Sequence, residues 1–211
     1  LAKYETFPLR LRTGDDASCL NLFQAARPRI LGAPNALIER GGFQFYQTAA
    51  STPEENSNPW LLLKRGPDPF LAVSDNRASE KELEENNAVP VFCENNTAVW
   101  MLKTGVGGIV TVPDDAGRDI KLKIVGTFAD SPFQSELIMS DENFVRLFPK
   151  QDGYRQFLIH VPPGQEESAA RELELGLRRN GFLATPTRDR VAAYQAVIGA
   201  YLSTFQLLGG F

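Results

Sequence analysis

The last 21 residues of the chain, 191–211, contain no charged side chain. About twenty apolar residues are enough to cross a bilayer, and the run becomes more apolar towards its end, although Gln195 and Gln206 interrupt it. Exposed chain ends of soluble domains are usually polar. We therefore expect an extramembrane helix that runs into a transmembrane helix continuing past Phe211. The chain starts at Leu1 with neither an initiator methionine nor a signal-peptide pattern, which indicates a segment of a longer protein.

The composition argues against most kinds of chemistry. The 211 residues carry a net charge of −4 and give a pI of about 5.2, so the basic surface that nucleic-acid binding needs is lacking. One histidine and two cysteines are too few for a structural zinc site or for most catalytic triads. We predict that the protein is not an enzyme, that it holds neither a metal nor a cofactor, and that it binds no nucleic acid.

Short strands and helices alternate along the chain, which predicts an α+β fold. Lysines alternate strictly with Ile120, Leu122 and Ile124, so we expect a β-hairpin over 109–128. Residues 48–59 are polar and rich in breakers, which predicts a surface loop. Further strands are predicted at 88–93, 137–139 and 157–161, and helices at 97–102, 142–148 and 166–179.

A long C-terminal helix is predicted to begin at Pro186, with Thr185 as its N-cap. Its apolar positions form one stripe of Tyr194, Val197, Tyr201, Phe205 and Leu208. From Pro186 to Leu208 such a helix measures roughly 35 Å at 1.5 Å per residue. We predict that this coupling helix joins the folded domain rigidly to the membrane span and transmits movement.

Cys19, Cys93 and His160 each allow two interpretations. A disulfide between the cysteines closes a loop of roughly 75 residues and contributes about 3–5 kcal/mol, whereas the alternative is two separate buried thiols. His160 lies in a predicted strand as a structural histidine, or it serves as the base of a hydrolase with a serine or cysteine within hydrogen-bond reach. The glycines at 105–108 predict a turn, because a strand rather than a helix follows them.

Two groups of motifs resemble bacterial ABC-transporter permeases of the MacB/FtsX-like class. The C-terminal run from Thr185-Pro186-Thr187 to Gly209-Gly210 is similar to the junction at which their extracytoplasmic domain re-enters the membrane. Val89-Pro90-Val91, followed by Gly107-Gly108 and a hairpin ending in Val125-Gly126, resembles the periplasmic core domain of the family. The resemblance covers about residues 88–211.

The resemblance implies a mixed two-lobe periplasmic core domain. A porter-like, membrane-proximal α/β lobe would comprise 1–87 and 150–211, and a small inserted β-rich lobe would comprise 88–149. It also implies a place on the periplasmic side of the inner (cytoplasmic) membrane. The implied partners are a cytoplasmic ABC ATPase subunit, a second permease in a membrane dimer, and a periplasmic protein or lipoprotein.

From the residues and the resemblance together we expect a non-catalytic permease domain. It would couple cytoplasmic ATP hydrolysis to export, lipoprotein release or activation of a periplasmic partner. The alternative is a free-standing periplasmic module that binds a ligand or a protein in a groove. A hydrolase built around His160 is a third hypothesis.

Overall fold

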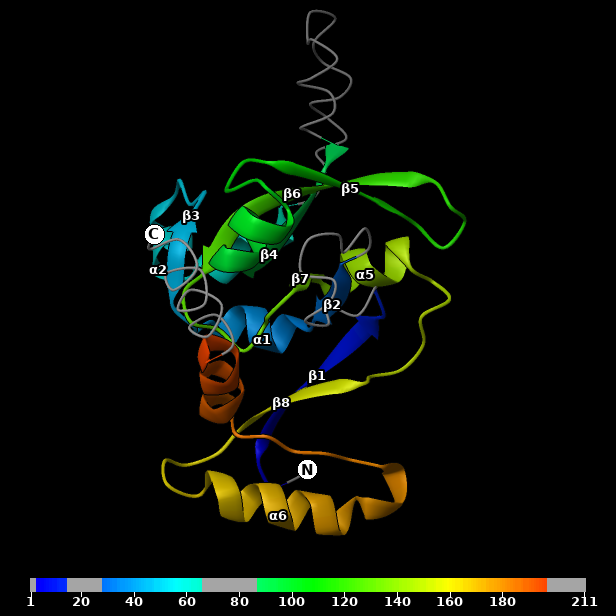
Figure 1. Cartoon of the computed structure of the whole chain (residues 1–211). Coiled ribbons are helices and arrows are strands. Elements are labelled where there is room, and N and C mark those ends of the chain that lie inside the picture. The colour runs from blue at the N-terminus through cyan, green and yellow to red at the C-terminus, as the bar shows by residue number, and fades with distance from the viewer. Residues whose placement is uncertain (1–2, 15–27, 66–86, 197–211) are drawn as a thin grey trace, which may run out of the picture. The chain divides into compact units, whose positions relative to one another are not determined.

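The computed structural model describes residues 3–14, 28–65 and 87–196, and Figure 1 shows how their helices and strands follow one another. The strands are β1 (Glu5–Arg12), β2 (Arg29–Ala33), β3 (Phe45–Thr48), β4 (Val89–Glu94), β5 (Ile109–Pro113), β6 (Asp119–Phe128), β7 (Glu136–Ser140) and β8 (Gln156–His160). The helical segments are α1 (Asn35–Arg40), α2 (Pro53–Ser57), the 3-10 helix η1 (Pro59–Lys64), the π-helix η2 (Thr97–Met101), α5 (Asp141–Leu147), α6 (Glu166–Gly176), the 3-10 helix η3 (Arg178–Asn180) and a further helix over 187–196.

Within the described residues, all eight strands belong to one mixed sheet in the order β3-β6-β4-β7-β2-β1-β8, with β5 paired to β6 beside this path. The pairs β2–β7 and β4–β6 are parallel, whereas β1–β2, β3–β6, β4–β7 and β5–β6 are antiparallel. Parallel neighbours cannot be joined by a tight hairpin, and further elements indeed lie between β2 and β7 and between β4 and β6 in the chain. The predicted α+β class is thereby confirmed, and the mixed sheet is a finding of the structure.

Both faces of the sheet are buried under apolar side chains. Neighbouring residues of one strand point to opposite faces, and Ile138 of β7 indeed belongs to one buried cluster while Leu137 and Met139 belong to the other. The first cluster is completed by residues of α1 and η1, among them Leu37 and Trp60. The second is completed by Ala98 of η2, Phe144 of α5, and Phe148, which directly follows α5.

The predicted hairpin is confirmed, with β5 and β6 in antiparallel register from Ile109↔Lys123 to Pro113↔Asp119. Alternating burial holds along β6 as far as Ile124, after which Val125, Gly126, Thr127 and Phe128 are all buried. The reason is the position of β6 in the sheet, since this half lies between β3 and β4. The expected strand periodicity therefore applies only to the half that forms the hairpin.

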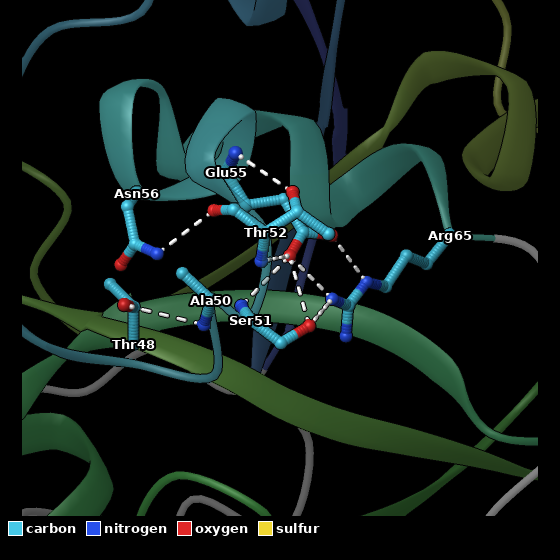
Figure 2. A network of polar contacts seen from close by, with 7 residues as sticks. All are labelled: Thr48, Ala50, Ser51, Thr52, Glu55, Asn56 and Arg65. Carbon is cyan, nitrogen blue, oxygen red and sulfur yellow. Dashed lines mark hydrogen bonds and ion pairs between the residues drawn. The ribbon is translucent and has the colours of Figure 1, made fainter.

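The prediction of a surface loop over 48–59 is wrong, because α2 forms there. Thr52 is its N-cap, and a capping box joins Thr52 to Glu55 in both directions. The Glu55 carboxylate also accepts hydrogen bonds from Ser51 N at 2.9 Å and from Arg65 Nε at 2.7 Å, as Figure 2 shows. This network closes the segment from residue 51 to residue 65 into a compact turn that brings Trp60 into the core.

The chain divides into two compact units, and the boundaries differ from those of the predicted lobes. One unit comprises Phe7–Leu158, and the other comprises Leu1–Thr6 with Ile159–Phe211. Residues 88–149 do not form a separate body, because β4, β6 and β7 pair with β2 and β3 in the same sheet. Shared backbone hydrogen bonds thus tie most of the predicted inserted lobe to the residues before it.

Candidate functional site

The unit that contains both ends of the chain is organised around helix α6. The structure describes residues 3–6 and 159–196 of this unit. Acidic side chains of α6 contact the N-terminal segment, the loop before the C-terminal helix, and that helix itself. We call this set the α6 junction; it consists of Lys3, Tyr4, Glu166, Glu167, Glu172, Glu174, Ala184 and Arg188.

Helix α6 forms as predicted, although it ends earlier. Ala169 and Leu173 are its buried residues, one helical turn apart, so they form the apolar face of an amphipathic helix. The helix ends at Gly176 rather than at residue 179, and η3 follows it. Gly181 then adopts the left-handed conformation, with φ 64° and ψ 29°, which glycine takes readily after a helix end.

The N-terminal segment contacts α6 through Glu172. Lys3 Nζ donates to Glu172 Oε2 at 2.7 Å, and Tyr4 Oη donates to the same oxygen at 3.0 Å. The hydrogen bond from Lys3 lowers the pKa of Glu172, and the hydrogen bond to Glu172 raises the pKa of Lys3. Both groups are therefore charged at any pH between the ordinary pKa of the carboxyl and that of the amine. The ion pair is lost when acid protonates Glu172 or when strong base deprotonates Lys3.

The C-terminal side of the junction has two contacts. Glu174 Oε1 accepts a hydrogen bond from Ala184 N at 2.9 Å, which fixes the loop that leads to the last helix. Arg188, in the first turn of that helix, forms an ion pair with Glu167 and lies 4.0 Å from Glu166 Oε2. The first turn of α6 thus holds the first turn of the C-terminal helix.

The predicted coupling helix is described only over 187–196. The Pro186 carbonyl accepts hydrogen bonds from Asp189 N at 3.0 Å and Arg190 N at 3.2 Å. Pro186 therefore occupies the cap position, and Thr185 lies one residue before it. Of the predicted stripe, Tyr194 is half-buried, whereas Val197, Tyr201, Phe205 and Leu208 lie outside the described residues.

A membrane-spanning helix was sought over residues 3–14, 28–65 and 87–196, and none of the helices there is both long and apolar enough. The predicted continuation past Phe211 is not tested by this result. Within the same three stretches, no group of three or more histidine, cysteine, aspartate or glutamate side chains is placed to hold a metal ion.

The structure places the sequence-predicted cysteine and histidine sites as follows. Cys93 is buried in β4, where burial first and the nearby Glu94 second raise its thiol pKa to about 12. A thiol with that pKa stays protonated at neutral pH, so Cys93 is unsuited to be a nucleophile. Cys19 lies outside the described residues, and the disulfide stays a prediction. His160 is the exposed last residue of β8.

Sequence reasoning missed most of the α6 junction. Glu167 lies in the first turn of the predicted helix, and nothing in the sequence pairs it with Arg188. Glu172 and Lys3 are 169 residues apart in the chain, and no spacing rule connects residues at that separation. The only available signal was the density of charge on the predicted helix 166–179.

Comparison with known proteins gives no match to any family model or to any curated protein. Among solved structures, the chain is similar to the extracellular domain of the noncanonic ABC-type transporter YknZ from Gram-positive bacteria. The identity is 11%, the TM-score is 0.39, and the match covers 82% of this chain and 75% of that one. It is also similar to the periplasmic region of MacB from Actinobacillus actinomycetemcomitans, with 12% identity, a TM-score of 0.38, and 92% and 76% of the two chains covered.

Proposed function

We propose that the chain is the non-catalytic extracytoplasmic domain of an ABC-transporter permease of the MacB/FtsX-like class. One observation carries the proposal: both ends of the described chain belong to one unit and contact the same helix, α6. A domain inserted between two membrane spans has to start and finish beside the bilayer. A unit that contains both chain ends meets this requirement.

The α6 junction gives the proposed domain a means of receiving movement from the membrane. A shift of either span would reach α6 through Lys3 and Glu172 at one end, or through Arg188 and Glu167 at the other. A helix transmits such a shift along its length because its backbone is hydrogen-bonded throughout. The C-terminal motif that starts at Thr185 supports the same role through its resemblance to the family.

In this proposal the chain acts on the periplasmic side of the inner membrane. A cytoplasmic ATPase subunit hydrolyses ATP, and a second permease copy completes a dimer in the membrane. The domain uses the resulting movement for export, for lipoprotein release or for activating a periplasmic partner. The motifs that carry the family resemblance, such as Val89-Pro90-Val91 and Gly107-Gly108, have a structural role in this proposal and no catalytic one.

The coupling role is tested in the full-length permease with its ATPase. Glu172→Lys removes both hydrogen bonds from the N-terminal segment and places a lysine opposite Lys3. We expect ATP turnover in membranes to persist, while the ability of the gene to complement its own deletion falls at least threefold. Adding Lys3→Glu restores the charge pair and should recover most of that loss.

Arg171→Ala is the matched control, since Arg171 is an exposed neighbour on α6 outside the junction. It should complement like the wild type. Full complementation by Glu172→Lys, with the protein present at wild-type level, would show that the junction does not couple.

Cell fractionation distinguishes the proposal from the alternative of a free-standing binding module. A permease domain predicts that the full-length protein stays in the membrane fraction after a carbonate wash. It also predicts that protease added outside the inner membrane digests residues 3–196. Recovery of the full-length protein in the soluble periplasmic fraction would overturn the permease assignment and leave the binding module.

A further inference from the structure

Among the described residues, the two most exposed large apolar side chains lie in one corner of the unit that contains helix α6. Leu175, near the end of α6, is 75% exposed, and Leu183, in the loop after it, is 85% exposed. The hydrogen bond from Ala184 N to Glu174 Oε1 joins the residue after Leu183 to the residue before Leu175. In Figure 1 the chain accordingly turns back after α6 and runs beside it. The two leucines therefore belong to one stretch of surface.

Two arginines lie between these leucines in the chain. Arg178 and Arg179 belong to η3, both are exposed, and neither forms an ion pair within the described part of the chain. No aspartate or glutamate occurs from residue 175 to residue 188. Glu174 borders this stretch, and its Oε1 already accepts the hydrogen bond from Ala184 N. We call Leu175, Arg178, Arg179 and Leu183 the Leu–Arg corner.

The composition of the Leu–Arg corner is typical of a protein-binding surface. Apolar side chains that stay exposed together mark surfaces that bind a partner. Arginine is enriched at such interfaces, because its planar guanidinium donates two parallel hydrogen bonds to one carboxylate. Charges at the border of an interface also select the sign of the partner. A partner that fits this corner therefore presents apolar side chains bordered by carboxylates.

Acidic residues beside the corner favour a protein over an anionic membrane. Glu172 and Glu174 lie within one helical turn of Leu175 on α6, closer than the screening length of about 8 Å at physiological salt. A membrane of anionic lipids presents an extended negative surface, which would repel these carboxylates while it attracts the arginines. A protein can place its own carboxylates opposite the arginines alone.

We propose that the Leu–Arg corner docks a separate protein through an apolar contact surface bordered by carboxylates. Leu175 and Leu183 contact the apolar part of that surface, and Arg178 and Arg179 bind the carboxylates around it. All four residues belong to the described part of the chain. The proposal does not depend on the permease assignment.

Photo-crosslinking in cells that express the full-length protein tests this docking. The photoreactive residue p-benzoylphenylalanine replaces Leu183, and mass spectrometry identifies each adduct and the partner peptide that carries it. We expect an adduct with another protein, through a peptide that contains aspartate or glutamate. The same replacement at Val145 is the matched control, because Val145 is 44% exposed on α5 in the other unit. It should not capture that protein.

Charge reversal then separates specific docking from chance capture. Arg178→Glu with Arg179→Glu should lower the yield of the Leu183 adduct at least about tenfold. Arg155→Glu changes an exposed arginine of the other unit and should leave the yield unchanged. Lysines in place of the carboxylates of the partner peptide should restore the adduct with the reversed corner.

Four results would overturn the proposal. A yield that does not respond to charge reversal would mean that the arginines select no partner. Adducts with lipid alone would place the corner against the membrane, and adducts with a second copy of this chain alone would make it a dimer contact. Absence of any adduct at Leu183 would mean that the corner faces only water.

Discussion

Phe128→Ala is expected to lower the free energy of unfolding by about 3–5 kcal/mol, the range for removing a fully buried phenyl ring. The Phe128 ring lies within 6.0 Å, centroid to centroid, of five other aromatic rings. They come from four separate parts of the unit: Phe43, Phe45, Trp60, Phe92 and Phe133. No single neighbour can relax into the space, so a cavity remains.

Urea unfolding followed by circular dichroism measures this loss. Tyr46→Ala provides the comparison on the neighbouring strand β3, because its ring is mostly exposed, and its change should stay within about 0.5 kcal/mol. A loss below about 1.5 kcal/mol in Phe128→Ala would mean that the aromatic cluster is loosely packed.

The hairpin β5–β6 and the helix α5 could be predicted because each depends on a pattern of neighbouring residues. The alternation at Ile120, Leu122 and Ile124 identified the hairpin. Ser140, directly before the predicted helix after β7, caps that helix, because its side chain accepts a hydrogen bond from Asn143 N. In such segments the physical cause of the structure lies within a few residues, so one sequence is enough.

Elsewhere the local signal was present but obscured. β1 was not predicted, although its apolar residues Phe7, Leu9 and Leu11 alternate along the chain. Pro8 lies among them, and a proline argues against a strand because it has no backbone N–H to donate to a neighbouring strand. The capping box from Thr52 to Glu55 follows a recognised sequence pattern. The polar composition around it outweighed that pattern and led to the prediction of a loop.

The candidate site could not be predicted because it depends on contacts across most of the chain. Lys3 meets Glu172, and both residues are exposed and charged, as are many others. Exposed charges show no periodicity that identifies their partners. Strand order could not be read from the sequence for a related reason: β7 lies beside β2 and β3 beside β6, and such pairing over long separations leaves no local signal.

The Glu55 network is expected to make the stability of the chain depend on acidity. The hydrogen bond from Ser51 N, followed by those from Arg65 and Thr52, lowers the pKa of the Glu55 carboxyl to about 2. A carboxyl whose pKa is lowered on folding stabilises the protein above its ordinary pKa and loses that effect as the pH falls towards 2. The part of the unfolding free energy that depends on Glu55 should therefore disappear between about pH 5 and pH 2.

Glu55→Gln isolates this contribution. In the wild type, Arg65 Nε lies 2.7 Å from Glu55 Oε1, and Arg65 Nη2 lies 2.5 Å from Glu55 Oε2. The amide of the variant keeps one acceptor oxygen but loses the negative charge opposite Arg65. The fall in pKa from 4.5 to about 2 corresponds to about 3 kcal/mol before solvent screening. Because the Arg65 side chain is 44% exposed, screening reduces this figure. We therefore expect the variant to be about 2–3 kcal/mol less stable than the wild type at pH 7 and almost equally stable near pH 2. Glu54→Gln changes the exposed neighbouring carboxyl and should follow the wild-type curve. If urea unfolding gives parallel curves for Glu55→Gln and the wild type from pH 7 to pH 2, then α2 is held by its packing and not by this charge.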